Sequence, residues 1–225
     1  ALRDHCRRYS DEDWRRVRAV YDSEVGWTDA QVGRLFEHLE QTGRFDDALI
    51  IFTHDHGEEF HDHGTIGHGY NLYEPTVGAP LIVHYPRDRG QTGRVDTPVS
   101  LLDIVPTVLS LANTDVPNDL IGTNLLGPLP PDRPVFSETD RGGEPVRAVR
   151  VGHRKLVHRA DRDQSRVFDL RSDPLEQDGA RASRADADLQ AFVDSWPESE
   201  LTAGAEPIDV DEAERAMLEA LGYLE

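Results

Sequence analysis

A run of apolar and β-branched residues from Asp47 to Thr53 constrains the fold of this 225-residue chain more than any other feature. Such a run is typical of a strand buried on both faces in a parallel sheet. The preceding residues, Ser10 to Gly43, repeat apolar positions at steps of three and four and predict one long helix. Ser10 with Asp13 resembles a capping box, and Gly43 stands where a left-handed C-cap belongs. A helix that feeds a buried strand indicates an α/β sandwich.

A second apolar run and a later change of pattern complete the expected topology. Ala79 to Tyr85 predicts another buried strand, and Ser100 to Ala112 predicts a helix. Beyond Pro134 the sequence changes to short β-rich pieces with turn residues between them, which is typical of an antiparallel meander. The expected strands of this meander are 135–137, 146–151, 155–158 and 166–170.

These patterns divide the chain into two expected parts. Residues 1–133 form an α/β domain in which helices cover a mostly parallel, buried sheet. Residues 134–225 form a smaller α+β subdomain with the antiparallel sheet. Two helices, around 185–196 and 210–221, close this subdomain and are joined by a flexible linker.

The charge balance restricts the partners. The chain has 43 acidic residues against 24 basic ones, which gives a net charge of −19 at pH 7. Such a chain repels phosphate backbones and anionic lipids, so we expect neither nucleic acid nor a membrane as a partner. Lys155 is the only lysine. Many carboxylates with almost no lysine suit a protein of concentrated salt, and we expect a halophilic, haloarchaeal source. An acidic domain encoded by a GC-rich genome is the alternative.

Cysteine usage and hydropathy restrict the class of protein further. Cys6 is the only cysteine, which excludes an internal disulfide and a cysteine-based zinc site. No apolar run has the length of a membrane span and no apolar signal segment is present, so we expect a cytoplasmic protein. The chain begins with Ala1, which fits either removal of an initiator methionine or a fragment whose upstream portion is absent.

One histidine-rich stretch carries the chemistry of the sequence. Five of the ten histidines fall between residues 54 and 68, interleaved with four acidic residues. The stretch follows the end of a predicted strand, where open α/β sheets place their ligands. Asp55 and His56 offer an oxygen and a nitrogen donor side by side, which suits a divalent cation. A solvated surface turn or an adventitious metal trap is the alternative interpretation.

Several motifs in this order carry a resemblance to a known family. They are Thr53-His54-Asp55-His56-Gly57, Gly67-His68-Gly69, Tyr73-Glu74, Ala79-Pro80-Leu81, Asp103-Ile104-Val105-Pro106-Thr107 and Phe168-Asp169-Leu170 followed by Asp173-Pro174-Leu175-Glu176. Together they resemble the C-terminal half of the sulfatases, a family of the alkaline phosphatase superfamily. The resemblance covers nearly the whole chain and implies the C-terminal part of an alkaline-phosphatase-like sandwich with a small antiparallel subdomain.

The resemblance implies a metal-assisted hydrolase of sulfate esters. In such enzymes an oxygen of a hydrated formylglycine or of Ser/Thr, activated by the cation, attacks sulfur. Asp55 and His56 match the later pair of metal ligands. His68 matches a Lys/His position that binds the anionic oxygens of the ester or helps the leaving group depart, which makes it the expected catalytic and substrate-binding residue. The implied cofactor is one divalent cation, Ca²⁺, Mg²⁺ or Mn²⁺, with Zn²⁺ as an alternative.

The sequence also departs from the family. The nucleophile motif Cys/Ser-x-Pro-x-Arg and the first pair of metal-binding aspartates are absent, and Cys6 is followed by Arg7-Arg8-Tyr9-Ser10. Any formylglycine therefore lies outside this chain. We expect a chain that is inactive alone, whose partners are a small-molecule sulfate or phosphate ester and a missing N-terminal half. The alternatives are a phosphonate or phosphate monoester hydrolase of the same superfamily and a non-catalytic truncated module.

Overall fold

The computed structural model describes residues 9–87, 90, 92–140, 145–162, 164–195, 214–215 and 217. The chain divides into two compact units, residues 1–194 and 195–225. In the second unit only residues 195, 214, 215 and 217 are described, and they are helical. Most of the helix expected at 210–221 therefore lies outside the described residues, as does Cys6. Within these described stretches, no helix combines the length and the apolar character that a bilayer crossing requires.

The first long element is helix α2 (Asp11–Gln41), as the sequence predicts. Its N-terminus is a complete capping box: the Ser10 hydroxyl accepts from the Asp13 N–H, and the Asp13 carboxylate accepts from the Ser10 N–H. At the other end Gly43 has a φ of +66°, a left-handed conformation that glycine adopts without strain. A 3₁₀ turn, η1 (Phe45–Asp47), then leads into strand β1 (Ile50–Thr53).

Strand β1 pairs with β4 (Leu81–His84) in an antiparallel register, with Ile51 opposite Val83. The parallel arrangement expected for these two runs is wrong. A parallel pair needs a crossover that carries the chain back to the starting end of the first strand. Here residues 54–80 stay at the end where β1 finishes, so β4 runs back in the opposite direction.

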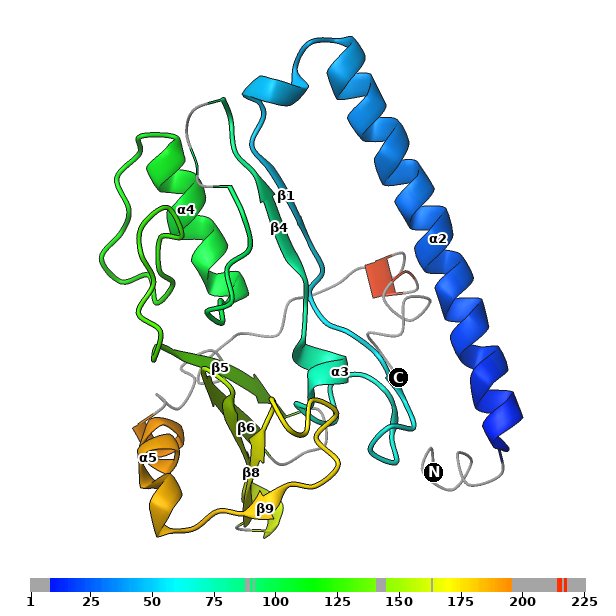
Figure 1. Cartoon of the computed structure of the whole chain (residues 1–225), viewed down its shortest axis with the longest axis vertical. Coiled ribbons are helices and arrows are strands. Elements are labelled where there is room, and N and C mark those ends of the chain that lie inside the picture. Colours follow the sequence, from blue (N-terminus) through cyan, green and yellow to red (C-terminus); the bar gives the residue numbers. More distant parts are fainter. Residues whose placement is uncertain are drawn as a thin grey trace. The chain divides into compact units, whose positions relative to one another are not determined.

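Burial of this strand pair also differs from the prediction. Phe52 is 38% exposed and Ile82 is 61% exposed, so the strands are not buried on both faces within the described residues. Figure 1 shows β1 and β4 running side by side between α2 and α4 (Ile104–Leu111). The turn η2 (Leu101–Asp103) precedes α4, and together they form the helix predicted between Ser100 and Ala112.

A buried ion pair fixes the start of that helix. The Asp103 carboxylate is fully buried and binds the Arg133 guanidinium through two contacts of 2.8 and 2.9 Å. Burial opposes its charge, but Arg133 and the N–H groups of Ser100 and Thr123 outweigh burial and lower the pKa of Asp103. The long connector after α4 is therefore anchored to Asp103 at its middle, through Thr123, and at its far end, through Arg133.

The predicted antiparallel meander is confirmed as a five-stranded sheet in chain order. Its last strand has only two residues and was not predicted from the sequence. The strands are β5 (Pro134–Thr139), β6 (Val146–Val151), β7 (Arg154–Arg159), β8 (Gln164–Asp169) and β9 (Ala180–Arg181). Two short turns, η3 (Ala160–Arg162) and η4 (Arg184–Asp186), and helix α5 (Ala187–Ser195) complete this region.

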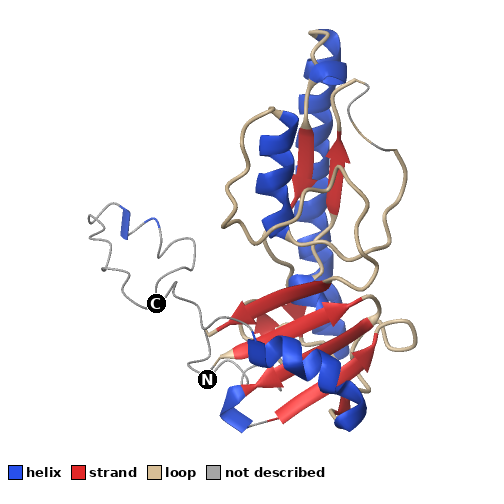
Figure 2. Cartoon of the chain, turned by 90° about the vertical axis from the view of Figure 1, so that its left-hand side faces the viewer, coloured by secondary structure: helices blue, strands red, loops and turns tan. Residues whose placement is uncertain are grey.

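The sheet buries both of its faces. On one face Val149 and Leu156 pack against Leu189 and Val193 of α5, which lies across the sheet in Figure 2. On the other face sheet residues including Phe168 pack against the segment that follows the histidine-rich stretch. That segment contributes Leu72, Tyr73 and Val77. The sheet therefore supports the stretch that carries the candidate site.

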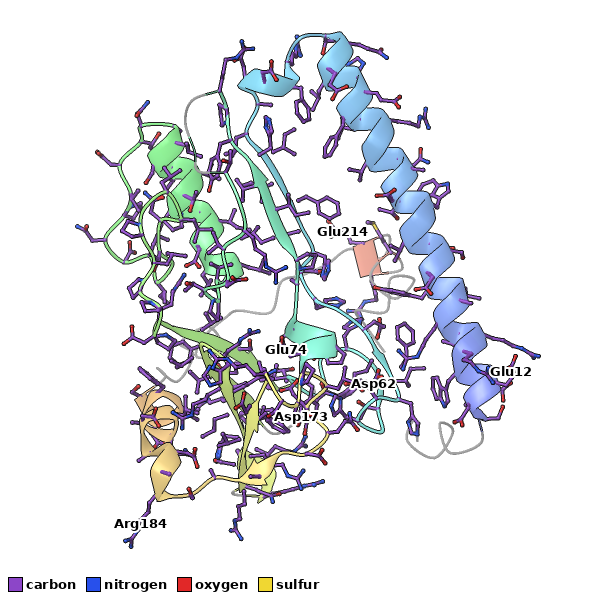
Figure 3. All side chains as sticks on the ribbon, in the orientation of Figure 1. Glu12, Asp62, Glu74, Asp173, Arg184 and Glu214 are labelled. Atoms are coloured by element: carbon purple, nitrogen blue, oxygen red, sulfur yellow. The ribbon has the colours of Figure 1, made fainter. Side chains whose placement is uncertain are left out.

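Lys155, the only lysine, is at the centre of a buried charge cluster on that second face. Its Nζ lies 3.0 Å from a Glu74 oxygen and 2.9 Å from a Glu176 oxygen, and its side chain is 2% exposed. Glu74 stands at the start of the short helix α3 (Glu74–Val77), labelled in Figure 3, and also pairs with Arg150 at 3.0 Å. Burial raises the pKa of Glu176 although Lys155 acts against that rise.

This cluster joins residues on both sides of the domain boundary expected at residues 133–134. Both sides belong to the same compact unit, and the boundary stays a prediction.

We predict that Lys155→Met lowers the free energy of unfolding by about 3–5 kcal/mol, because it leaves Glu176 as an uncompensated buried carboxylate. Urea unfolding followed by circular dichroism measures the change. Arg171 is exposed and serves as the matched control, so Arg171→Met should stay within about 0.5 kcal/mol of the wild type. Equal stability of the two variants would contradict the role of the cluster.

Candidate active site

Asp55 and His56 follow directly on β1, at the end where the chain turns back. The Asp55 carboxylate accepts from the His56 N–H at 3.0 Å. The Nδ1 of His56 lies 2.9 Å from the Gly57 carbonyl oxygen. Because a carbonyl oxygen only accepts, Nδ1 carries a hydrogen, and in the neutral ring that a metal ligand requires Nε2 keeps its lone pair. This Nε2 lies 3.8 Å from the second Asp55 oxygen, so two metal-binding atoms stand close together.

Gly57 fixes this turn against α3. Its N–H donates to the Thr76 carbonyl oxygen at 2.8 Å. A Cβ at this position would lie 2.0 Å from the Pro75 carbonyl oxygen, a distance that no side chain tolerates. The close approach of these two backbone segments therefore requires glycine at position 57. It holds the Asp55–His56 pair next to α3, which packs on the antiparallel sheet through Val77.

A two-stranded hairpin brings His68 back to His56. Its strands are β2 (Glu59–Phe60) and β3 (Ile66–Gly67). The His56 and His68 rings stack with centroids 3.8 Å apart and an angle of 24° between their planes. Asp55, His56 and His68 all line one cavity of about 350 Å³. A larger cavity of about 790 Å³ along β4 contains none of the three, so the smaller one is the candidate site.

A second part of the cavity wall comes from β5, far along the chain. Ser137, Glu138 and Thr139 line it, and the Thr139 hydroxyl donates to the Gly69 carbonyl oxygen at 2.6 Å. Glu138 forms an ion pair with Arg147 at 2.9 Å. Sequence reasoning missed these residues, because no local pattern marks an edge strand as the neighbour of a loop seventy residues earlier.

The other histidines of the stretch lie elsewhere. His54 is exposed. His61 stacks on Trp14 of α2 with centroids 5.2 Å apart, and it has a left-handed φ of +71°. Close by, Arg18 of α2 binds Asp62, labelled in Figure 3, at 2.7 Å. The structure therefore divides the cluster into two cavity histidines and others that are exposed or hold the loop in place.

His63 connects the hairpin to the C-terminal sheet. Its Nδ1 donates to Glu59 at 2.5 Å and its Nε2 donates to the Leu175 carbonyl oxygen at 3.0 Å. The Glu59 carboxylate and the Leu175 carbonyl oxygen only accept, so these two contacts favour the charged ring with a hydrogen on each nitrogen, while the Gln177 amide nitrogen lies 3.3 Å from the same Nε2. Burial opposes this charge, but the hydrogen bond to and the charge of the fully buried Glu59 outweigh it and raise the pKa of His63.

The donors present fit part of a metal shell. Among the residues that the structure describes, no three Asp, Glu, His or Cys side chains converge to hold a metal ion. Asp55 and the free Nε2 of His56 are a hard oxygen and a borderline nitrogen, a pair that suits a divalent cation. Two donors do not complete the coordination shell of any of these cations, so the remaining ligands must come from outside this pair.

The comparisons with known proteins agree with these features. The family profile "Sulfatase" matches residues 3–114. The uncharacterized sulfatase YidJ of Escherichia coli K12 is 34% identical over 159 residues, which is 67% of this chain and 31% of that protein. The choline-sulfatase of Rhizobium meliloti is 31% identical over 197 residues, 82% of this chain and 38% of that protein.

A solved structure gives the same result for the fold. The phosphonate monoester hydrolase of Agrobacterium radiobacter superposes with a TM-score of 0.67 at 30% identity, over 82% of this chain and 40% of that one. The architecture is therefore that of the alkaline phosphatase superfamily, as predicted. The chain spans between 31% and 40% of the length of these three proteins.

The His63–Glu59 pair predicts a pH dependence of stability. Because the pKa of His63 is raised on folding, its contribution is complete below the unfolded value of about 6.5 and is lost as the pH rises through the folded pKa. The other ionisable groups that face it are Tyr73, Asp62 and Glu176. Urea unfolding over a pH series should show a stability of the wild type that falls as the pH rises above about 6.5.

The same series in two variants isolates the pair. His63→Gln should lose most of this pH dependence, while His54→Gln, which changes an exposed histidine, should keep it. Parallel curves for the wild type and His63→Gln would contradict the assignment of the charge to His63.

Proposed function

Because the sulfatase family profile matches residues 3–114, we propose that this chain supplies part of the active site of a metal-dependent hydrolase of sulfate esters. One observation carries the proposal. Asp55 and His56, which match metal ligands of the family, share a cavity with His68, which matches a residue that contacts the ester. A surface turn or an adventitious metal site would not require the buried contacts of this loop, which are the packing of Leu72 on the sheet and the His63–Glu59 hydrogen bond.

Each of the three residues has a defined task in this proposal. The Asp55 carboxylate and the Nε2 of His56 hold the cation, Ca²⁺, Mg²⁺ or Mn²⁺ with Zn²⁺ as the alternative. When bound, the cation neutralises anionic oxygens and activates the attacking oxygen. When Nε2 of His68 also carries a proton, the charged ring binds the non-bridging oxygens or gives that proton to the leaving oxygen.

The nucleophile must come from another polypeptide segment. The sequence contains no Cys/Ser-x-Pro-x-Arg motif. The chain covers 31% and 38% of the two sulfatase relatives, and we assign the nucleophile and the remaining metal ligands to a segment equivalent to the rest of those proteins.

Exposed apolar side chains support such a partner. On α2, Val25, Trp27 and Leu35 are between 51% and 64% exposed. On β4 and α4, Ile82 is 61% and Val105 is 51% exposed. Apolar patches of this kind mark surfaces that another element covers. We expect the N-terminal half to cover them when it completes the site.

A phosphonate or phosphate monoester is the second candidate substrate. The solved phosphonate monoester hydrolase is 30% identical, and phosphonate and sulfate esters share tetrahedral geometry and anionic oxygens. A single pair of metal ligands with one histidine does not distinguish them, because both esters present the same kind of oxygen to the site.

We predict that the isolated chain does not hydrolyse 4-nitrophenyl sulfate or a phenyl phosphonate ester with any of the four cations, in low or high salt. The physical reason is the absence of a nucleophile rather than of folding. Circular dichroism should therefore confirm a folded chain in the same samples. Robust turnover by the isolated chain would contradict the proposed half-site.

Adding the missing segment, in trans or as a fusion, should produce metal-dependent turnover. In that completed protein Asp55→Ala should reduce turnover to background, because it removes a metal ligand. Asp178 lies exposed in the loop before β9 rather than on α2, so Asp178→Ala is the matched control and should keep full activity. Unchanged kinetics of Asp55→Ala would exclude Asp55 as a ligand, and comparison of the two substrates would decide between the ester classes.

A further inference from the structure

Glu58 and His68 stand opposite each other at the open end of the hairpin. In the register of β2 and β3, Glu59 pairs with Gly67 and Phe60 pairs with Ile66. Glu58 directly precedes β2 and His68 directly follows β3, so the antiparallel register places the two side by side. The backbone pairing of β2 and β3 therefore places the Glu58 carboxylate next to the His68 imidazole.

The two side chains are in contact. A Glu58 carboxylate oxygen lies 3.3 Å from Nδ1 of His68. An ionised carboxylate only accepts, so Nδ1 is the nitrogen that carries the hydrogen. His68 lines the cavity and Glu58 does not. The ring therefore turns Nδ1 towards Glu58 and leaves Nε2 as the nitrogen available to a ligand in the cavity.

The surroundings keep Glu58 in this place. The next residue, Glu59, is fully buried and binds both the backbone N–H and the ring of His63. Gly67 has a left-handed φ of +87°, and a Cβ there would lie 3.7 Å from the second Glu58 oxygen. That second oxygen is buried and has no hydrogen-bond partner among the described residues. The carboxylate is therefore held against one partner, the His68 ring.

His56 completes the arrangement from the other side. Its ring stacks on the face of His68, which limits rotation out of the plane but does not choose between the two ring nitrogens. Glu58 supplies that choice, because in a free neutral imidazole the hydrogen prefers Nε2 and only a hydrogen bond at Nδ1 reverses the preference.

We propose that Glu58 is the positioning residue of the site: it fixes the tautomer and the orientation of His68 so that Nε2 faces the sulfate or phosphonate ester. The role of His68 towards an ester rests on the proposed function. The control of its tautomer by Glu58 does not, and it is measured without turnover.

The experiment is a long-range ¹H–¹⁵N spectrum of the imidazoles in the full chain, at about pH 9 where most histidines are neutral. In the wild type, His68 should show a protonated Nδ1 and an unprotonated Nε2. Glu58→Leu should exchange the two, with Nε2 protonated. Glu58→Gln should restore the wild-type pattern, because the amide oxygen still accepts from Nδ1.

Two controls separate positioning from folding. His84, whose Nδ1 lies 3.0 Å from the Ala48 carbonyl oxygen, reports on the fold at a distance and should not change in any folded variant. Glu37 lies exposed on α2, so Glu37→Leu removes the same charge away from the site and should leave His68 unchanged.

Two results would overturn the proposal: a wild-type His68 with its hydrogen on Nε2, or a Glu58→Leu variant with His84 intact and His68 unchanged. If instead His68 follows the expected pattern and the completed protein hydrolyses no ester, the proposed function fails while the positioning by Glu58 stands.

Discussion

The antiparallel return of the chain from β1 to β4 is the constraint on which the site depends. It keeps residues 54–80 at one end of the strand pair, so all of their polar groups gather there. The turn is tight enough that Gly57 touches the backbone of α3, where no side chain fits. Asp55, His56 and His68 thus come from a single loop whose position is set by two short strands.

Buried charge holds this loop on the antiparallel sheet. His63 and Glu59 connect the hairpin to Leu175, and Lys155 connects Glu74 to Glu176. Removing two charges from water costs free energy that their attraction only partly returns, so such pairs add little net stability. Their value is specificity: each pair is satisfied in one arrangement, and that arrangement sets the position of the cavity histidines.

Local patterns were sufficient for most elements. Helix α2 was predicted with its capping box because periodicity and caps act within a few residues. Strand β6 was predicted at its observed bounds, Val146–Val151. The direction of the β1–β4 pairing was predicted wrongly. An apolar run indicates that a strand is buried, but it does not indicate how the chain connects one strand to the next. The exposure of Ile82 shows that even burial depends on which elements are present to cover a strand.

By itself the sequence determined the α/β class, the antiparallel meander and the residues on which the metal-site proposal rests, because these follow from short-range order and from motifs a few residues long. Only the tertiary structure decided which of five neighbouring histidines share a cavity, which hold the loop, and that β5 lines the same cavity. It also brought Glu58 to His68 through the register of a hairpin. These contacts join residues that are distant in the sequence or that a hairpin brings together. No local sequence pattern predicts them.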